Sequence, residues 1–86
     1  MSGPTVAERL RGLDSVREAE VLGVPDEEWG ERVVAFVVGE VGLDEVRDHV
    51  AAELPREWAP RQVVEVAGIP LLANGKVDRV LLRSLA

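Results

Sequence analysis

Residues 21–38, VLGVPDEEWGERVVAFVV, decide the fold of this chain. Pro25 and Asp26 favour a turn between two apolar segments, because proline fixes its own φ angle and aspartate bonds to nearby backbone. The second segment, Val33–Val38, is apolar throughout and follows turn residues. A run of this kind is typical of a strand that is buried on both faces. We therefore expect residues 32–39 to form the middle strand of a small sheet.

The segment before the turn, residues 17–24, is expected to pair with that middle strand. Within it Ala19 and Val21 alternate with Glu18 and Glu20. Side chains alternate between the two faces of a strand, so this strand has one apolar face and one partly solvated face.

Trp29 stands in the loop that joins these two strands. A large aromatic side chain in such a loop either packs over the end of the hairpin or contacts a partner. The first arrangement is the one that the sequence alone favours.

Apolar residues repeat at helical spacing in three further segments. Thr5 and Glu8 fit a capping box at the start of the first segment, and Asp78 is placed to cap the last one. His49 lies on the polar face of the second, where we expect it to be solvated and not catalytic. The predicted helices are residues 5–12, 43–54 and 78–84, and a third strand is predicted at residues 62–67.

These elements follow the order α-β-β-α-β-α. The 86 residues contain no internal repeat, low-complexity segment or linker. We therefore expect residues 1–86 to form a single α+β domain, a small three-stranded sheet with flanking helices.

The composition disfavours several classes of function. The formal net charge is −6, which argues against nucleic acid or an anionic membrane as partner. The chain has no cysteine, so disulfide and zinc–thiolate chemistry are excluded, and a reducing, cytoplasmic location is expected. With one histidine and no clustered carboxylates, no metal site is predicted. No segment is apolar and long enough to span a bilayer.

Residues 70–79, called the lysine loop below, read Pro-Leu-Leu-Ala-Asn-Gly-Lys-Val-Asp-Arg. Lys76 is the only lysine of the chain, and the other basic residues are all arginines. Asn74 and Gly75 form a turn dipeptide, because both residue types tolerate positive φ. The start of a helix just beyond this turn favours anions. The ammonium group is therefore placed to meet a phosphate or a carboxylate.

The pattern Pro-x-x-x-x-Gly-Lys-x-x-Arg in the lysine loop resembles the last core motif of the adenylate-forming enzymes. These include acyl-CoA synthetases, peptide-synthetase adenylation domains and luciferases. Residues 21–38 are similar to the strand–turn–strand hairpin of the same family, with its Val-Pro-Asp turn and Trp-Gly-Glu. The spacing between the two stretches fits the family's small C-terminal domain, and the resemblance extends from about Thr5 to Leu85.

The resemblance implies the mobile C-terminal lid of an ATP-dependent ligase. Such an enzyme joins an acid to AMP and then passes the acyl group to CoA or to the phosphopantetheine of a carrier protein. The implied partner is a large N-terminal adenylation domain that binds ATP and the acid. Mg²⁺ is expected to enter with ATP and not to bind this chain.

By match of motif, Lys76 is the family's catalytic lysine, which bridges the carboxylate of the acid and the α-phosphate. A compact ammonium on a flexible stem suits this role, because two anions must be held together. The remaining assignments are support of the loop by Asn74, Gly75 and Arg79, and contact with the partner domain by Trp29 and Gly30.

Two features depart from the family pattern. The chain begins after the hinge and the first β-loop of the family's small domain, and it has no Ser/Thr/Gly-rich phosphate loop. We therefore expect an excised domain, a separately encoded half or a derived binding module, and not a complete ligase. In addition, Leu71 and Leu72 replace more polar residues, which makes the lysine loop more apolar.

Two other functions fit parts of the sequence. Residues 12–16, Gly-Leu-Asp-Ser-Val, imitate the serine site of an acyl carrier protein. Ser15, however, leads into a strand pattern, whereas the carrier serine opens a helix. The stronger alternative is a non-catalytic module that keeps the lid fold and binds a ligase or a carrier protein.

Overall fold

The computed structural model describes all 86 residues, Met1–Ala86. It confirms the α+β class and the predicted order α-β-β-α-β-α, with one additional 3₁₀ turn. The elements are α1 (Gly3–Leu10), β1 (Val16–Asp26), β2 (Gly30–Gly39), α2 (Leu43–Ala51), η1 (Arg56–Trp58), β3 (Gln62–Glu65) and α3 (Arg79–Ser84).

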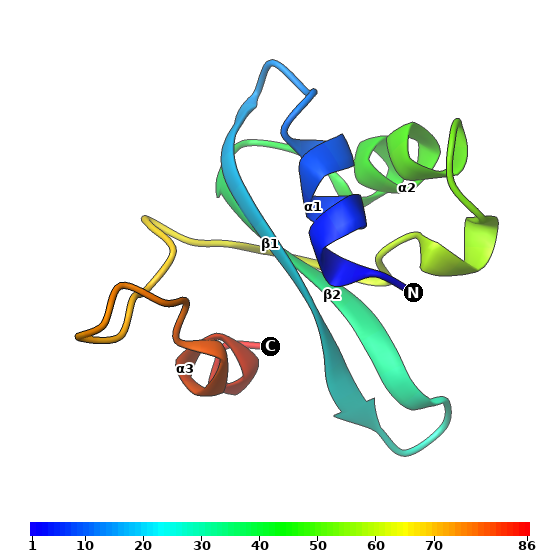
Figure 1. The fold of residues 1–86 in the computed structure, drawn as a ribbon. Coiled ribbons are helices and arrows are strands. Elements are labelled where there is room, and N and C mark those ends of the chain that lie inside the picture. The colour runs from blue at the N-terminus through cyan, green and yellow to red at the C-terminus, as the bar shows by residue number, and fades with distance from the viewer.

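The three strands form one mixed sheet in the order β1-β2-β3. β1 and β2 are antiparallel neighbours, and β3 runs parallel to β2. A parallel pair needs a crossover connection, which α2 and η1 supply. Figure 1 shows α1 and α2 together on one side of the sheet and α3 on the other.

β2 is the middle strand, and its centre is buried on both faces as predicted. Four consecutive residues, Val34–Val37, have no solvent exposure. Ala35 and Val37 pack with α1 and α2 in the larger apolar cluster. Val34 and Phe36 belong to a second cluster, with Leu82 of α3, on the opposite face. The sheet is therefore covered on both faces, and the second cluster holds α3 in place.

The start of α1 differs from the prediction. Ser2 is the N-cap, and its Oγ accepts hydrogen bonds from the backbone N–H of Thr5 (3.3 Å) and from the Thr5 hydroxyl (2.9 Å). Pro4 lies in the first turn, where its missing N–H costs nothing. The predicted Thr5–Glu8 capping box is wrong, and Glu8 instead pairs with Arg11 at 3.2 Å.

Pro25 and Asp26 extend β1 and do not end it, since they pair with Glu31 and Gly30. The turn is formed by residues 27–29. Pro25 fits there because β1 is an edge strand, where a missing N–H can be tolerated. The strand therefore ends two residues later than predicted, at Asp26.

His49 was predicted to be fully solvated, but its side chain is half-buried. Its ring Nε2 lies 3.0 Å from the carbonyl oxygen of Arg9, to which an Nε2–H donates. In return, Nε of Arg9 donates to the carbonyl oxygen of His49 at 3.0 Å. This reciprocal pair joins α1 to α2, which gives the histidine a structural role.

No helix in the structure has the length and apolar character needed to cross a membrane.

Candidate functional site

The lysine loop folds as a tight hairpin between β3 and α3. Leu71 and Val77 form an antiparallel bridge. The next pair toward the tip is Leu72 and Lys76, and the backbone N–H of Leu72 donates to the carbonyl oxygen of Lys76 at 2.7 Å. These contacts place Lys76 directly after the tip of a hydrogen-bonded turn.

Two local features form the tip of this hairpin. The N–H of Gly75 donates to the carbonyl oxygen of Leu72 at 2.9 Å, and Gly75 has φ of 86°. A turn followed by a left-handed glycine is a common three-residue hairpin connection. Asn74 Oδ1 accepts the backbone N–H of Lys76 at 3.0 Å. The predicted turn at Asn74 and Gly75 is therefore present, with positive φ at Gly75 and not at Asn74. Support of the lysine by these residues stays a prediction.

The side chain of Lys76 is exposed. It takes part in none of the three ion pairs of the domain, which join Arg9 to Glu53, Arg11 to Glu8 and Arg32 to Asp26. It is also the only charged residue in the segment 66–77. The ammonium group has no ion-pair partner within this chain, which leaves it available to an anion outside the domain.

α3 fixes the far end of the lysine loop. Asp78 caps this helix as predicted, because its Oδ1 accepts the backbone N–H of Leu81 at 3.0 Å. Leu82 is fully buried, and Nε of Arg83 donates to the carbonyl oxygen of Gly23 at 3.1 Å. Arg79, the first residue of α3, is exposed. It lies just beyond the hairpin, and its side chain makes no hydrogen bond within the domain.

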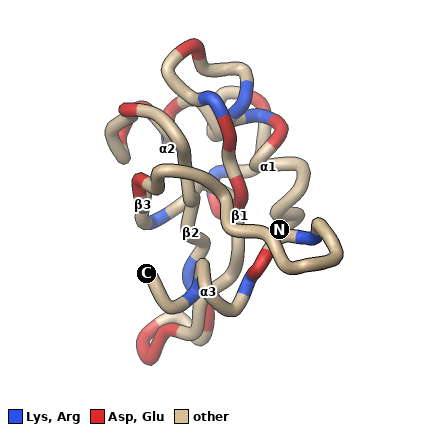
Figure 2. Tube along the Cα trace, turned by 90° about the vertical axis from the view of Figure 1, so that its left-hand side faces the viewer, with Lys and Arg blue, Asp and Glu red and all other residues tan.

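Trp29 and Gly30 lie in a different part of the molecule, at the β1–β2 turn. Figure 1 places this turn and the lysine loop at separate ends of the domain, and Figure 2 shows that the turn is largely acidic. Trp29 is 57% exposed. The guanidinium carbon of Arg61 lies 4.4 Å from the centre of its ring, a cation–π distance. One ring face is therefore covered from within the chain, and contact of Trp29 with a partner stays a prediction.

Asp26 organises the same turn. Its Oδ1 accepts the backbone N–H groups of Glu28 and Trp29, each at 2.9 Å, and its Oδ2 lies 3.5 Å from the guanidinium of Arg32. The hydrogen bond from Trp29, with smaller contributions from Glu28 and Arg32, lowers the pKa of Asp26 below its usual value. The turn that carries Trp29 and Gly30 is thus fixed by a charged carboxylate.

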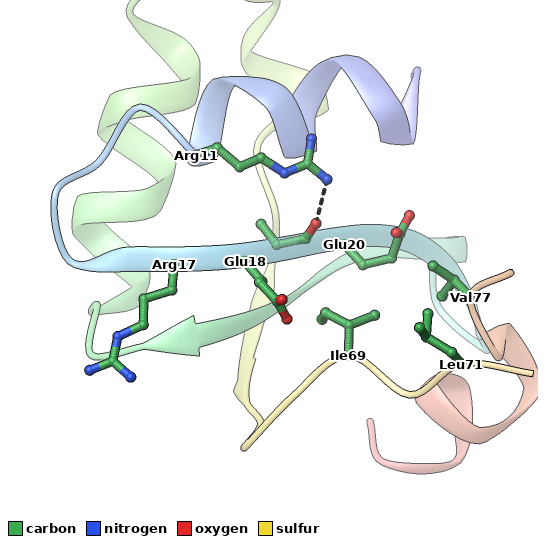
Figure 3. Close-up of a pocket in the computed structure, with 8 residues that line it drawn as sticks. Arg11, Arg17, Glu18, Glu20, Ile69, Leu71 and Val77 are labelled. Atoms are coloured by element: carbon green, nitrogen blue, oxygen red, sulfur yellow. Dashed lines mark hydrogen bonds between the residues drawn. The ribbon is translucent and has the colours of Figure 1, made fainter. Parts of the chain in front are cut away.

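A groove that the sequence analysis missed separates the lysine loop from β1. It has a volume of about 250 Å³. Figure 3 shows Leu71 and Val77 pointing into it, and Arg11 donates to the carbonyl oxygen of Ala19 at its rim (2.9 Å). The lining residues are Arg11, Arg17, Glu18, Ala19, Glu20, Ile69, Leu71 and Val77.

The walls of this groove come from segments about fifty positions apart, so local pattern analysis could not join them. The one available signal was the pair Glu18 and Glu20 on the solvated face of an edge strand.

The side chains offer no group of three or more carboxylate or imidazole ligands that could hold a metal ion.

Comparison with known proteins identifies the family. Residues 5–76 match the model of the AMP-binding enzyme C-terminal domain. The acetyl-coenzyme A synthetase of Streptomyces coelicolor is 38% identical over 93 residues, a match that covers 100% of this chain and 14% of that enzyme. The probable acyl-activating enzyme 4 of Arabidopsis thaliana is 36% identical over 77 residues, which covers 84% of this chain and 14% of that protein.

A solved structure agrees with these relatives. The amide bond synthetase McbA from Marinactinospora thermotolerans has a TM-score of 0.89 and 35% sequence identity, over 98% of this chain and 18% of that one. The chain therefore belongs to the AMP-binding enzyme C-terminal domain family of the adenylate-forming ligases. This confirms the resemblance found in the sequence. The MatB structure from Rhodopseudomonas palustris, which contains bound ATP, is 25% identical over 98% of this chain with a TM-score of 0.88.

The chain spans 14% of the length of each of the two curated relatives named above. In these relatives the matched domain is thus a small part of a longer protein.

Proposed function

We propose that this domain is the mobile lid of an ATP-dependent acid–thiol ligase and that it supplies Lys76 to the adenylation step. One observation carries the proposal: the only lysine of the chain is exposed, has no ion-pair partner and lies directly after the tip of a hydrogen-bonded hairpin. The family match supports it, because residues 5–76 include this lysine as their last residue.

The reaction has two steps. A carboxylate oxygen of the acid attacks the α-phosphorus of ATP, the bond from that phosphorus to the β-phosphate oxygen breaks, and pyrophosphate leaves. The product is an acyl-adenylate. In the second step a thiol attacks the acyl carbon, AMP leaves with the bonding electrons, and the thiol proton passes to solvent. The acceptor thiol is that of CoA or of a carrier protein's phosphopantetheine.

Lys76 acts in the first step. Carboxylate and triphosphate repel each other, and negative charge shifts among the phosphate oxygens as the new bond forms. An ammonium between the carboxylate and the α-phosphate reduces this repulsion and stabilises the charge. The exposed tip gives Lys76 the reach that this position requires, and the bonds of Asn74 and Gly75 hold its backbone in place.

The test measures both half-reactions in an intact ligase that contains this domain. Acyl-adenylate formation is followed by ATP–pyrophosphate exchange, with acetate, benzoate and octanoate as trial acids. Thioester formation is followed from supplied acyl-adenylate. Lys76→Ala should slow exchange by about 10²–10³, the effect of losing one preorganised electrostatic contact. Thioester formation should stay within about twofold of the parent, because a mobile lid carries Lys76 away from the phosphate in that step.

Arg56→Ala is the matched control. Arg56 is exposed, and its removal changes the net charge by the same amount without touching the lysine loop. Residues 1–86 alone should give no exchange, because they contain no phosphate loop. Unchanged exchange in Lys76→Ala would favour the non-catalytic lid-fold module, which binds a ligase or carrier protein without doing chemistry.

A further inference from the structure

The two faces of the lysine hairpin carry different side chains. Leu71 and Val77 form a cross-strand pair, and both point into the groove beside β1 (Figure 3). Side chains alternate along an extended strand. The adjacent pair, Leu72 and Lys76, therefore lies on the opposite face, away from the groove.

Leu72 is the nearest cross-strand neighbour of Lys76. Their backbones are joined by the 2.7 Å hydrogen bond, and side chains of such a pair have Cβ atoms roughly 4.5–5.5 Å apart. The leucine is 46% exposed. A lysine stem is only four carbons long, so the surface that the ammonium reaches lies close to Leu72.

The surroundings of Lys76 determine the chemistry of that surface. No other charged residue lies in the segment 66–77, and Leu72 and Ala73 are both exposed on the hairpin. A complementary partner must then offer an anion for Lys76 and an apolar wall beside it for Leu72. This partner is the N-terminal domain of the same enzyme, because under the proposed function Lys76 meets the carboxylate and the α-phosphate on that domain.

From these observations we infer that Leu72 is a docking residue, which holds the lid in its adenylating position by packing on an apolar wall of the N-terminal domain. The inference rests on the proposed function of Lys76. Docking removes the exposed half of one leucine side chain from water, which favours the docked position by about tenfold. Leu72 touches neither ATP nor the acid, and its effect reaches the chemistry through the position of Lys76.

The experiment compares two identical substitutions on opposite faces of one hairpin, in the intact ligase. Leu72→Asn should slow ATP–pyrophosphate exchange about tenfold and leave thioester formation from supplied acyl-adenylate within about twofold. Leu71→Asn is the matched control, because Leu71 is 62% exposed but points into the groove. Leu43→Asn is a second control on the other side of the sheet. Both controls should stay within about twofold of the parent in both steps.

A double variant separates this inference from the proposed function. If Leu72 acts by positioning Lys76, adding Leu72→Asn to Lys76→Ala should lower exchange no further. In addition, Lys76 should react faster with an amine-acylating reagent in Leu72→Asn than in the parent, when ATP and acid are present and modification is followed by mass spectrometry.

Three results would overturn the inference: equal losses in Leu72→Asn and Leu71→Asn, equal losses in both half-reactions, or additive losses in the double variant. Failure of the proposed function would give a different result, namely full ATP–pyrophosphate exchange in Lys76→Ala.

Discussion

At the scale of single residues, Gly75 determines where the ammonium of Lys76 lies. Its φ of 86° is in the left-handed region, and no atom lies within 4 Å of the position that a Cβ would take. A side chain at position 75 is therefore disfavoured by the backbone conformation and not by contact with neighbouring atoms. For L-residues other than asparagine and aspartate this conformation costs roughly 1–2 kcal/mol.

Gly75→Ala should lower ATP–pyrophosphate exchange at least about tenfold, because the hairpin relieves that cost by moving Lys76. Gly75→Asn should keep more activity, because asparagine tolerates the left-handed region. Gly68→Ala is the control, since Gly68 also lies in open space but has no positive φ. Equal exchange in Gly75→Ala and Gly75→Asn would contradict the conformational explanation.

Local rules were sufficient to predict the turn in this hairpin and the cap of the helix after it. Asn74 and Gly75 favour a turn by their own backbone preferences, and Asp78 caps the next helix through its own carboxylate. The groove beside β1 could not be predicted in the same way, because Glu18 and Ile69 meet only after the sheet has formed.

At the scale of elements, the β1–β2 hairpin is the part whose centre was predicted well and whose end was not. The continuous apolar run Val33–Val38 identified β2 from its sequence, and the structure buries Val34–Val37 completely. β1 can extend through Pro25 because β1 is an edge strand. The sequence of one strand does not show whether that strand lies at the edge of the sheet. The turn itself depends on the carboxylate of Asp26, which binds two backbone N–H groups.

The charge of Asp26 makes the stability of this turn depend on pH. The hydrogen bonds from Trp29 and Glu28 and the charge of Arg32 lower the pKa of Asp26 in the folded state. These interactions are absent in the unfolded chain. The stabilisation is therefore complete above the unfolded pKa of about 4, and is lost as the pH falls through the lower folded pKa.

Asp26→Asn should lower the melting temperature at pH 7, because it removes the charge. The substitution keeps an acceptor oxygen, so it tests the charge alone. The difference from the parent should shrink as the pH falls below about 4. Glu27→Gln, on the adjacent exposed residue, is the control and should leave the melting temperature unchanged at pH 7. A difference for Asp26→Asn that is the same at pH 7 and pH 3 would show that the charge does not stabilise the turn.

At the scale of the whole molecule, the two apolar clusters support different functions. The larger one joins α1 and α2 to the sheet, and Leu10 is among its fully buried members. The smaller one holds α3 through Leu82, and Val77 of the lysine loop packs against it. The position of Lys76 thus depends on the smaller cluster, although both clusters stabilise the domain.

Leu82→Ala and Leu10→Ala are therefore a matched pair, because both leucines have no solvent exposure. Each substitution should cost roughly 2–5 kcal/mol of folding free energy, out of roughly 4–13 kcal/mol expected for 86 residues. The difference lies in activity. Well below both melting temperatures, Leu82→Ala should lower ATP–pyrophosphate exchange about tenfold or more, because α3 can leave the sheet locally while the rest stays folded. Leu10→Ala should keep exchange near the parent level.

The two measurements are a melting curve and the rate of ATP–pyrophosphate exchange, both on the intact ligase. Equal destabilisation with a selective loss of exchange in Leu82→Ala is the expected result. If both variants lost exchange in proportion to their fraction unfolded, the domain would unfold as one cooperative unit. The smaller cluster would then have no separate role in positioning Lys76. If instead Leu82→Ala kept full exchange, the hairpin bonds of Leu72 and Gly75 would be sufficient to position the lysine without α3.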